Sequence, residues 1–473
     1  MPNAAPVLVW FRRDLRLSDH QALTAACAGG GPVIPVFVLD KETETLGAAP
    51  KWRLGLSIAD LAQRLESLGS RLILRRGNAL TVLRDLLHET GGRAVHWTRL
   101  YSPEAIARDK GVKSHLRSEG YEAHSYLGHL LHEPWEIETG AGNYYKVFTP
   151  YWRAASSREV SGPLAEIAAI PAPDTWPATE RLADWSLGAE MNRGAEVVRE
   201  HVRVGESAAH ERLTTFLNGR IGKYAEDRDR PDRVATSGLS ENLTYGEISP
   251  RAIWHACERA SVDGGTGVET FRKELVWREF AWHLMWHTPH IVERSWRDGW
   301  ERFPWRGDSA DAERWRRGMT GEPMIDAGMR QLYVTGTMHN RVRMLVASYL
   351  TKHLMTHWKV GLDWFAECLV DWDPASNAMG WQWAAGSGPD AAPYFRIFNP
   401  QGQAEKFDPD GAYRHRFIAG FGDGKPSRDG LSFFRAAPRS WWIEPNDPYP
   451  TALIDLKEGR QVALSAYKKH TGG

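Results

Sequence analysis

One stretch of the chain, from Val370 to Phe407, combines residues suited to binding a flat molecule with a polar edge. Its candidate hydrogen-bonding and stacking residues are Asp371, Asp373 and Asn377, and Trp372, Trp381 and Trp383. Gly, Ala and Ser between them would let a ligand approach the backbone closely, and the larger side chains offer hydrogen bonds and π surfaces. The apolar residues follow neither a helical nor a strand period. A pocket for a planar cofactor is one interpretation, and a Trp-rich core loop with capping aspartates is the other.

A second polar group precedes the helix-start pattern ENLTYGEISPRAIW. It consists of Thr236, Ser237, Gly238, Leu239 and Ser240. Hydroxyl groups and backbone amides in such a position either cap the helix or bind a phosphate group. Further along the chain, Arg343 and Asp371 have opposite charges and could pair, for which a structural salt bridge is the simplest interpretation.

Tryptophan is abundant, with 22 residues in the chain, and the excess makes an aromatic-dependent function more plausible. Glu274 and Trp277 are three residues apart and share one helix face, which alone fits an amphipathic helix with a core Trp and a solvated Glu. Trp305, Trp358 and Trp381 stand on separate segments, and each one taken singly is more often a core residue.

Composition excludes several classes of protein. The formal net charge is zero, so any nucleic-acid-binding surface must be local. The three cysteines are far apart, which is neither a disulfide framework nor a zinc pattern and suits a reducing cytoplasm. No His, Cys and carboxylate set has metal-ligand spacing, so no metal site is predicted. No long apolar run or signal peptide is present, so we expect neither a membrane span nor secretion.

Residues 1–130 are predicted to form an α/β domain with a doubly wound parallel sheet, because strands and helices alternate. The expected strands are Val7–Phe11, Val33–Leu39, Arg71–Leu74, Ala94–Trp97 and Ala123–Tyr126. The expected helices are His20–Ala28, Trp52–Leu68, Ala79–Glu89 and Pro103–Glu119. The three glycines after Ala28 end a helix and do not follow a strand, so they are not a dinucleotide fingerprint.

The remaining chain loses this alternation. Residues 131–209 are predicted to be an interdomain linker, in which the aromatic segment Tyr144–Trp152 is expected to dock against the first domain. Residues 210–473 are predicted to be an all-α domain. Its expected helices are Ala209–Leu217, Ser249–Ala260, Thr270–His287, Ala312–Arg317, Met324–Tyr333, Arg341–Trp358 and Trp364–Val370. The tail after Ile418 is rich in Gly, Pro and Arg and allows no prediction.

Four motifs together resemble the photolyase/cryptochrome family. They are VWFRRDLRLSDH (Val9–His20), KELVWREFAWHL (Lys273–Leu284), GTMHNRVRM (Gly336–Met344) and DPASNAMGWQWAAGSGPDAAPYFRIFNP (Asp373–Pro400). They occur in family order and span nearly the whole chain, and the chain looks most similar to class III cyclobutane pyrimidine dimer photolyases. The resemblance implies an all-α C-terminal domain that binds FAD and DNA, and a light-dependent carbon–carbon lyase that repairs such dimers. The alternative is a cryptochrome-type photoreceptor that signals without repair.

The resemblance implies a set of FAD-binding residues. They are Tyr224, Thr236, Ser237, Gly238, Leu239, Ser240, Phe271, Arg278, Asn340, Arg343, Asp371, Asp373 and Asn377. Asn377 would face the flavin N5, where plant cryptochromes usually carry an aspartate, so it favours repair over signalling. The family often has a bulkier or basic residue where Gly238 stands, so one direct contact with the diphosphate could be missing.

The resemblance also implies catalytic and substrate-binding residues. The dimer, flipped out of the duplex, would be held by Glu274, Trp277, Asn340, Arg341, Met344 and Trp383. A protonated Glu274 would donate to the thymine carbonyls, which requires burial beside apolar groups. Trp381, Trp358 and Trp305 would relay an electron to the excited oxidised flavin. His339 is followed by Asn340 and lacks a histidine partner, which disfavours a 6-4 photolyase.

Further expectations concern DNA phosphates and a second chromophore. Candidate phosphate contacts are Arg228, Arg230, Arg233, Arg341 and Lys406, although each alone is more often a surface charge. The segment LGAAPKWRLGLSIADL, with Trp52, resembles the version that binds a methenyltetrahydrofolate antenna, whereas Trp52 could simply open a helix. We expect a monomer that acts in a bacterial cytoplasm on DNA containing pyrimidine dimers.

Overall fold

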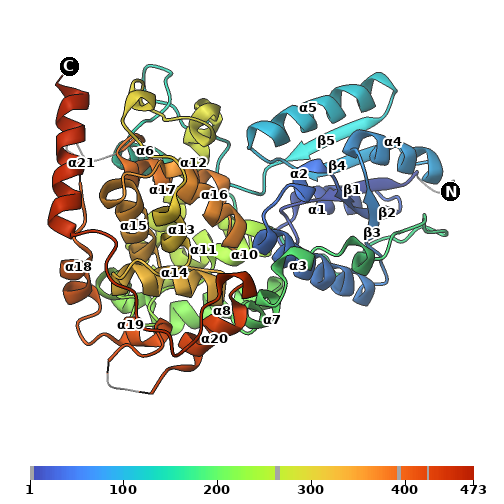
Figure 1. Cartoon of the computed structure of the whole chain (residues 1–473). Helices are drawn as coiled ribbons and strands as arrows, with labels where there is room; N and C mark the ends of the chain where they lie inside the picture. Colours follow the sequence, from blue (N-terminus) through green and yellow to red (C-terminus); the bar gives the residue numbers. More distant parts are fainter. Residues whose placement is uncertain (1–4, 262–266, 391–395, 423–424, 473) are drawn as a thin grey trace.

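The N-terminal domain is built on a five-stranded parallel sheet with the strand order β3-β2-β1-β4-β5 (Figure 1). The structure is a computed structural model that describes residues 5–261, 267–390, 396–422 and 425–472. The strands are β1 (Val7–Phe11), β2 (Val33–Leu39), β3 (Ile73–Arg76), β4 (Ala94–Thr98) and β5 (Glu122–Tyr126). The domain's helices are α1 (Gln21–Ala28), α2 (Lys41–Glu44), α3 (Ala48–Ser67), α4 (Ala79–Thr90) and α5 (Pro103–Ser118).

Helices cover both faces of this sheet, as expected for parallel strands that read as continuous apolar runs. The buried side chains of α1 and α3 pack on one face, against Val7, Val9 and Phe11 of β1. Those of α4 and α5 pack on the other face, against Leu8 and Trp10. The predicted doubly wound α/β fold is therefore confirmed, although β3 begins two residues later than predicted.

The segment between the sheet and the helical part covers one sheet edge. Leu74 of β3 receives a hydrogen bond at its carbonyl from Glu180 N (2.9 Å) and donates its N–H to Thr179 Oγ1 (2.8 Å). The segment thereby shields an edge strand that would otherwise present unpaired backbone groups. It also contains α6 (Phe148–Ser156) and α7 (Gly194–Arg199).

The expected docking of Tyr144–Trp152 on the first domain is wrong. Phe148 of α6 stacks on Trp277 with ring centroids 3.7 Å apart, and Tyr151 packs on Phe280. Both partners belong to α12, in the helical domain. Aromatic composition predicted that the segment would be buried, but it could not indicate which of two apolar surfaces would cover it.

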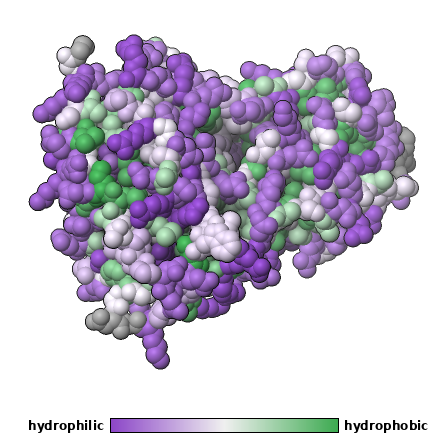
Figure 2. All heavy atoms as spheres, viewed as in Figure 1, coloured by the Kyte–Doolittle hydropathy of each residue, from purple (hydrophilic) through white to green (hydrophobic). Residues whose placement is uncertain are grey.

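The described residues beyond α7 form helices and connecting segments, and every strand of the described residues lies within 7–126. The helices are α8 (Glu206–Gly219), α9 (Tyr224–Asp227), α10 (Ser240–Tyr245), α11 (Pro250–Ser261), α12 (Gly267–His287), α13 (Ala310–Arg316), α14 (Pro323–Thr335), α15 (Asn340–Ser348), α16 (Trp358–Cys368), α17 (Pro374–Ala385), α18 (Pro400–Phe407), α19 (Ala412–Phe417), α20 (Arg428–Ala436) and α21 (Leu456–Thr471). No helix in the described ranges is long and apolar enough to span a membrane. On the face drawn in Figure 2, hydrophilic side chains predominate and a furrow separates the two lobes.

The single helix expected over Arg341–Trp358 is wrong, because the chain breaks into two helices there. After α15 come a π-helical turn, Tyr349–His353, and then Met355, which has a positive φ of 55°. His357 then caps α16 by accepting a hydrogen bond from Lys359 N at 3.2 Å. Apolar periodicity continues through this break, so the sequence did not reveal it.

The loop that follows β1 joins the two domains. Arg16 donates to the carbonyls of Gly246 (2.9 Å) and Gly128 (3.0 Å), and Asp19 forms an ion pair with Arg251. Leu15 N donates to the carbonyl of Tyr245 (3.0 Å). The segment VWFRRDLRLSDH therefore attaches the sheet to the turn between α10 and α11.

A buried carboxyl on α12 is expected to make stability depend on pH. Glu279 accepts from Leu131 N at 2.8 Å and lies 3.6 Å from Arg278, yet burial raises its pKa to about 7. The folded protein then holds a proton that the unfolded chain has lost, so the free energy of unfolding should fall as pH rises from about 4.5 to 7. The fall is about 3 kcal/mol at most.

Glu279→Gln tests this dependence. We expect denaturation midpoints of the variant to change less than wild type between about pH 5 and pH 8, and the variant to be the more stable protein at the alkaline end. Parallel pH profiles of the two proteins would contradict the assignment to Glu279.

Candidate active site

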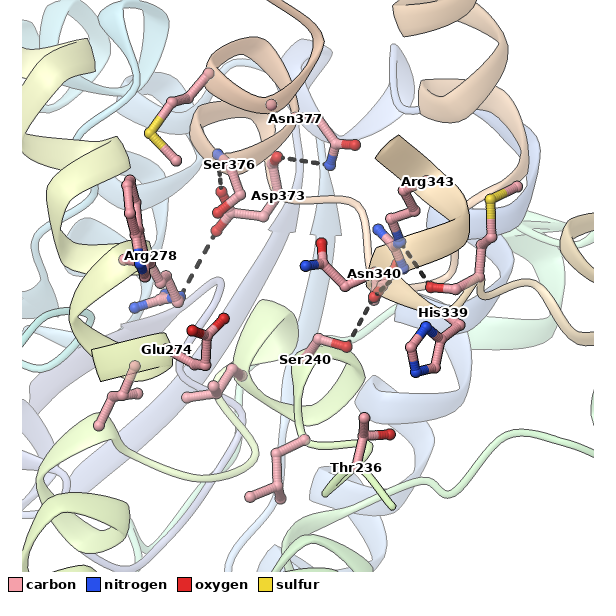
Figure 3. A pocket seen from close by; sticks show the side chains of 18 of the residues that line it. Thr236, Ser240, Glu274, Arg278, His339, Asn340, Arg343, Asp373, Ser376 and Asn377 are labelled. Atoms are coloured by element: carbon pink, nitrogen blue, oxygen red, sulfur yellow. Dashed lines mark hydrogen bonds and ion pairs between the residues drawn. The ribbon is translucent and has the colours of Figure 1, made fainter. Parts of the chain in front are cut away.

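A cavity of about 620 Å³ opens in the helical domain, between α10, α12, α15 and α17 (Figure 3). It brings together almost the whole predicted site. The predicted residues that line it are Tyr224, Thr236, Ser237, Gly238, Leu239, Ser240, Phe271, Glu274, Trp277, Arg278, Asn340, Arg343, Met344, Asp371, Asp373, Asn377, Trp381 and Trp383. Its size is in the range of small-molecule and cofactor sites.

Asp371 joins three segments of the cavity wall. Arg343 of α15 donates to both of its carboxylate oxygens, at 2.7 and 3.0 Å, and Ser240 Oγ of α10 donates at 2.7 Å. Thr244 Oγ1 also donates to the backbone carbonyl of Asp371, at 3.2 Å. The predicted Arg343–Asp371 pair is present. Because Arg343 remains partly exposed in the cavity wall, the pair is both structural and accessible to a ligand.

The stretch that suggested a flat ligand contains a helix, α17, which begins with a cap. Asp373 accepts from Ser376 N at 2.8 Å, and Pro374 occupies the first turn, where a proline needs no hydrogen bond. Asn377 then donates its amide N–H to the carbonyl of Asp373 at 2.9 Å. Its amide oxygen therefore remains available to accept a hydrogen bond from a ligand (Figure 3). Residues 391–395 of the stretch lie outside the described residues.

The backbone around α17 leaves room for a flat group. A Cβ added to Gly380, which lines the cavity, would meet no atom of the described residues within 4 Å. Gly238, at a φ of +70°, has the Arg212 guanidinium 3.8 Å from the position of its missing Cβ, and its carbonyl accepts from Arg212 Nη1 at 2.9 Å. A basic group thus stands beside Gly238 although the position itself carries none.

Most of the residues predicted to hold the substrate line this cavity. Trp277 of α12 and Trp383 of α17 both line it, with Met344 of α15. Glu274 forms an ion pair with Arg228, and its side chain is 28% exposed. A neutral Glu274 would need to be enclosed by apolar groups. Its side chain is instead paired with Arg228 and partly exposed, so the geometry does not support this part of the prediction.

The three tryptophans of the predicted relay run from the cavity toward the surface. Trp381 lines the cavity and packs closely against Gly361 of α16, where an added Cβ would come within 2.0 Å of the indole ring. Trp358 lies one turn earlier on α16 and is fully buried. His357 stacks on Trp358 (5.4 Å) and meets Trp305, which is partly exposed, at 5.8 Å. The relay residues are therefore close in space, with His357 between the outer two.

Several predicted residues do not line the cavity. Arg341 pairs with Asp229 at 2.6 Å and lies over the Phe407 ring. Of the candidate phosphate contacts, Arg228 alone faces the cavity, while Arg230 and Arg233 form local ion pairs with Asp232 and Asp227. Lys406 is exposed on α18.

Trp52 lies in a core cluster beneath the linker. Its ring packs against Gly188, where an added Cβ would come within 2.8 Å, and against apolar residues of α7. A second cavity, of about 930 Å³, lies between the two domains and is not lined by Trp52. It shares Thr244 and Asp373 with the first cavity, so these two residues border both spaces.

Other residues that line the cavity were not predicted from the sequence, including Thr244, Met338, His339, Phe365 and Ser376. Most are apolar or small and read as helix core. His339 caps α15, with Nδ1 accepting from Arg341 N at 3.2 Å, and burial lowers its pKa to about 4. It is therefore a neutral ring at neutral pH, and its place just before a predicted helix was the one signal of the cap.

The chemistry of this cavity is that of a site for a large polar-edged aromatic ligand. Its lining offers hydroxyl groups and backbone, a guanidinium–carboxylate pair, an amide oxygen and three indoles. Among the described residues, no group of His, Cys, Asp and Glu could hold a metal ion. An organic cofactor fits these residues better than a metal does.

Comparisons with known proteins agree with this description. Residues 7–174 match the model described as DNA photolyase, and residues 271–469 match that described as the FAD binding domain of DNA photolyase. A deoxyribodipyrimidine photo-lyase of Agrobacterium fabrum is 46% identical over 98% of both chains, and one of Halobacterium salinarum is 36% identical over 98% of this chain and 99% of its own. The crystal structure of a bacterial class III photolyase from Agrobacterium tumefaciens covers 100% of this chain and 99% of its own, with a TM-score of 0.93 and 45% identity.

Proposed function

The chain belongs to the DNA photolyase family, and we propose that it repairs cyclobutane pyrimidine dimers in DNA by light-dependent electron transfer from FAD. The observation that carries this function is the meeting of Asn377, the Arg343–Asp371 pair and the two indoles Trp277 and Trp383 in one cavity. Asn377 and the Arg343–Asp371 pair suit a flavin, and the indoles suit the apolar flank of a flipped-out pyrimidine dimer.

Specific residues would hold FAD in this cavity. We assign the Thr236–Ser240 segment to the diphosphate, and Arg343, Asp371 and Asn377 to the edge of the flavin ring. The hydroxyls of Thr236 and Ser237 and the amides around Gly238 are suited to phosphate oxygens. When bound and reduced, FAD supplies the electron that opens the dimer after absorption of light. The protein would bind and orient FAD and exclude water from the cavity.

The dimer would enter beside the flavin. Trp277 and Trp383 offer π surfaces to the cavity, and Asn340 and Met344 of α15 also line it. Trp277 is held rigidly by its stack on Phe148, so its orientation is fixed before DNA binds. Glu274, paired with Arg228, would orient the arginine toward a phosphate or base edge.

The alternative function is a signalling photoreceptor without repair. Asn377 favours repair, because its amide can both accept and donate a hydrogen bond, which would support a reduced flavin, at a position where plant cryptochromes usually carry an aspartate. Trp277, Trp383 and Met344 would have no evident use in a protein that does not bind a dimer. These four residues make repair the better-supported function.

A second chromophore, methenyltetrahydrofolate, remains a proposal. The cavity between the domains is a better candidate for this site than the surroundings of Trp52, because Trp52 is enclosed in a core cluster outside that cavity. Denaturing the purified protein and identifying the released chromophores by absorbance and mass tests this directly. The monomeric state and action on chromosomal DNA in a bacterial cytoplasm likewise remain predictions, the first of which size-exclusion chromatography tests.

Trp277→Ala tests the substrate site. We expect it to weaken binding of an oligonucleotide with one thymine dimer by about 1–3 kcal/mol, the usual worth of one base–aromatic stack, and to leave binding of undamaged DNA unchanged. Trp442→Ala is the matched control, because Trp442 is 88% exposed and does not line the cavity. Equal affinities of wild type and Trp277→Ala for the damaged oligonucleotide would remove Trp277 from the site.

Glu274→Gln separates the role of this residue from that of Trp277. The substitution keeps the shape of the side chain and removes its ion pair with Arg228. We expect slower dimer repair with little change in FAD content, measured as repair per absorbed photon. Repair equal to wild type would show that Glu274 has no part in the reaction.

A further inference from the structure

Helix α10 has two faces with different partners. Ser240, Leu243 and Thr244 line the cofactor cavity, and two of them hydrogen-bond to Asp371. Glu241 and Tyr245 point the other way, into the contact with the α/β domain. A six-residue helix is too short to hold its own position, so its place beside the cavity must be set by what packs behind it.

One arginine of the α/β domain packs behind α10. Arg53 of α3 is completely buried, and its guanidinium spans two buried carboxylates, Glu241 of α10 and Glu247 just after that helix. It donates to Glu241 Oε1 at 2.6 Å, and to both oxygens of Glu247 at 2.9 and 2.8 Å. A further N–H reaches the carbonyl of Arg203 at 3.0 Å. Such a two-pronged pair fixes orientation as well as distance.

The charges of this network balance inside the protein. Glu241 also accepts from Arg212 at 2.8 Å, so two carboxylates meet two guanidinium groups. Burial by itself would lower the pKa of Arg53, but Glu247 and Glu241 raise it above its ordinary value. Arg212 continues the network to the carbonyl of Gly238, within the segment assigned to the diphosphate.

A second contact reinforces the same helix. The Tyr245 hydroxyl lies 2.6 Å from the carbonyl of Val370 and 3.1 Å from that of Pro50, and it shares its single proton between these two acceptors. Pro50 is in the first turn of α3, and Val370 immediately precedes Asp371. The Arg53 guanidinium also lies over the Tyr245 ring, 4.8 Å from its centroid. Helix α3 therefore reaches two separate parts of the cavity wall through α10.

We propose that Arg53, a residue of the α/β domain, is a positioning residue for FAD: it holds α10 and the Thr236–Ser240 segment at the distance that the cofactor requires. The inference rests on the proposed FAD site. It assigns the α/β domain a part in binding the redox cofactor, in addition to any antenna. By reciprocity, binding of FAD should tighten the contact between the domains.

Arg53→Met tests the proposal by titration of cofactor-free protein with FAD, followed by flavin fluorescence. Arg251→Met is the matched control, since Arg251 also loses a buried interdomain ion pair, with Asp19, but lies on α11 and does not line the cavity. We expect Arg53→Met to raise the Kd for FAD at least about tenfold, and Arg251→Met to change it by less than about threefold. Wild-type affinity in Arg53→Met, or equal losses in the two variants, would overturn the proposal.

A second variant covers the case in which Arg53→Met does not fold, since it leaves Glu247 buried without its partner. Arg53→Met/Glu247→Met removes that carboxylate as well, and the same weakening of FAD binding is expected. Hydrogen exchange supplies an independent readout: amides of α10 should exchange faster in the variant, and adding FAD to wild type should slow exchange in α3.

The titration does not depend on repair. A wild-type protein that binds FAD but leaves dimers intact would contradict the proposed function and leave the role of Arg53 standing. A wild-type protein that binds no FAD would overturn both.

Discussion

Trp381→Phe is expected to slow the light-driven reduction of bound, oxidised flavin by roughly 100-fold, which corresponds to about 2.7 kcal/mol of activation free energy. Trp381 is the relay residue that lines the cavity, and phenylalanine fills most of its space but is far harder to oxidise. The measurement is the loss of oxidised-flavin absorbance under blue light, with an external electron donor present.

Trp315→Phe is the control for this result. The ring centroids of Trp315 and Trp381 are 6.0 Å apart in an edge-to-face arrangement, and both side chains are buried. Trp315 lies outside the predicted route through Trp358 and Trp305. Equal slowing in both variants would show that the electron does not pass specifically through Trp381, Trp358 and Trp305. A variant that lacks Trp381 yet photoreduces at the wild-type rate would exclude the relay altogether. Chemically reduced Trp381→Phe should still repair dimers, which separates flavin reduction from opening of the dimer.

Asp371→Ala is expected to yield protein that is almost free of FAD. The carboxylate is 4% exposed and receives hydrogen bonds from Arg343 and Ser240, so its loss leaves a guanidinium unpaired and frees α10 from α15. Breaking a buried pair by removing one partner typically costs about 3–5 kcal/mol, which as a loss of affinity is roughly 150- to 5000-fold. The ratio of flavin to protein absorbance after purification measures the effect.

Asp371→Asn provides the graded comparison. It keeps the shape of the side chain and one acceptor oxygen, so FAD content should lie between those of wild type and Asp371→Ala. Wild-type flavin content in Asp371→Ala would contradict the assignment of the Arg343–Asp371 pair to the cofactor.

The elements that could be predicted from the sequence are those with local signals. Strand Val7–Phe11 is a short apolar run with no competing helical pattern, and the structure places it in the middle of the sheet. The cavity residues were found because their motifs resemble those of a known family, whereas composition alone left a core loop equally open. The cavity shows that the polar residues of α17 face a common space, which chain order cannot show.

What the sequence could not predict depends on distant contacts. The break after α15 arises from the backbone of Met355 and the cap at His357, within an apolar pattern that continues unchanged. Tyr144–Trp152 was expected on the wrong domain, because burial does not indicate the partner. Arg53 reads as an ordinary helix residue, yet its partners Glu241 and Glu247 lie almost two hundred positions away.

The most direct test of the central claim is anaerobic illumination of the photoreduced protein with an oligonucleotide that contains a thymine dimer. Repair restores the ultraviolet absorbance of intact thymine, and we predict that this absorbance recovers in the light and stays unchanged in darkness. A protein whose flavin is reduced by light, but which restores no thymine absorbance, would contradict the account and identify a signalling photoreceptor instead.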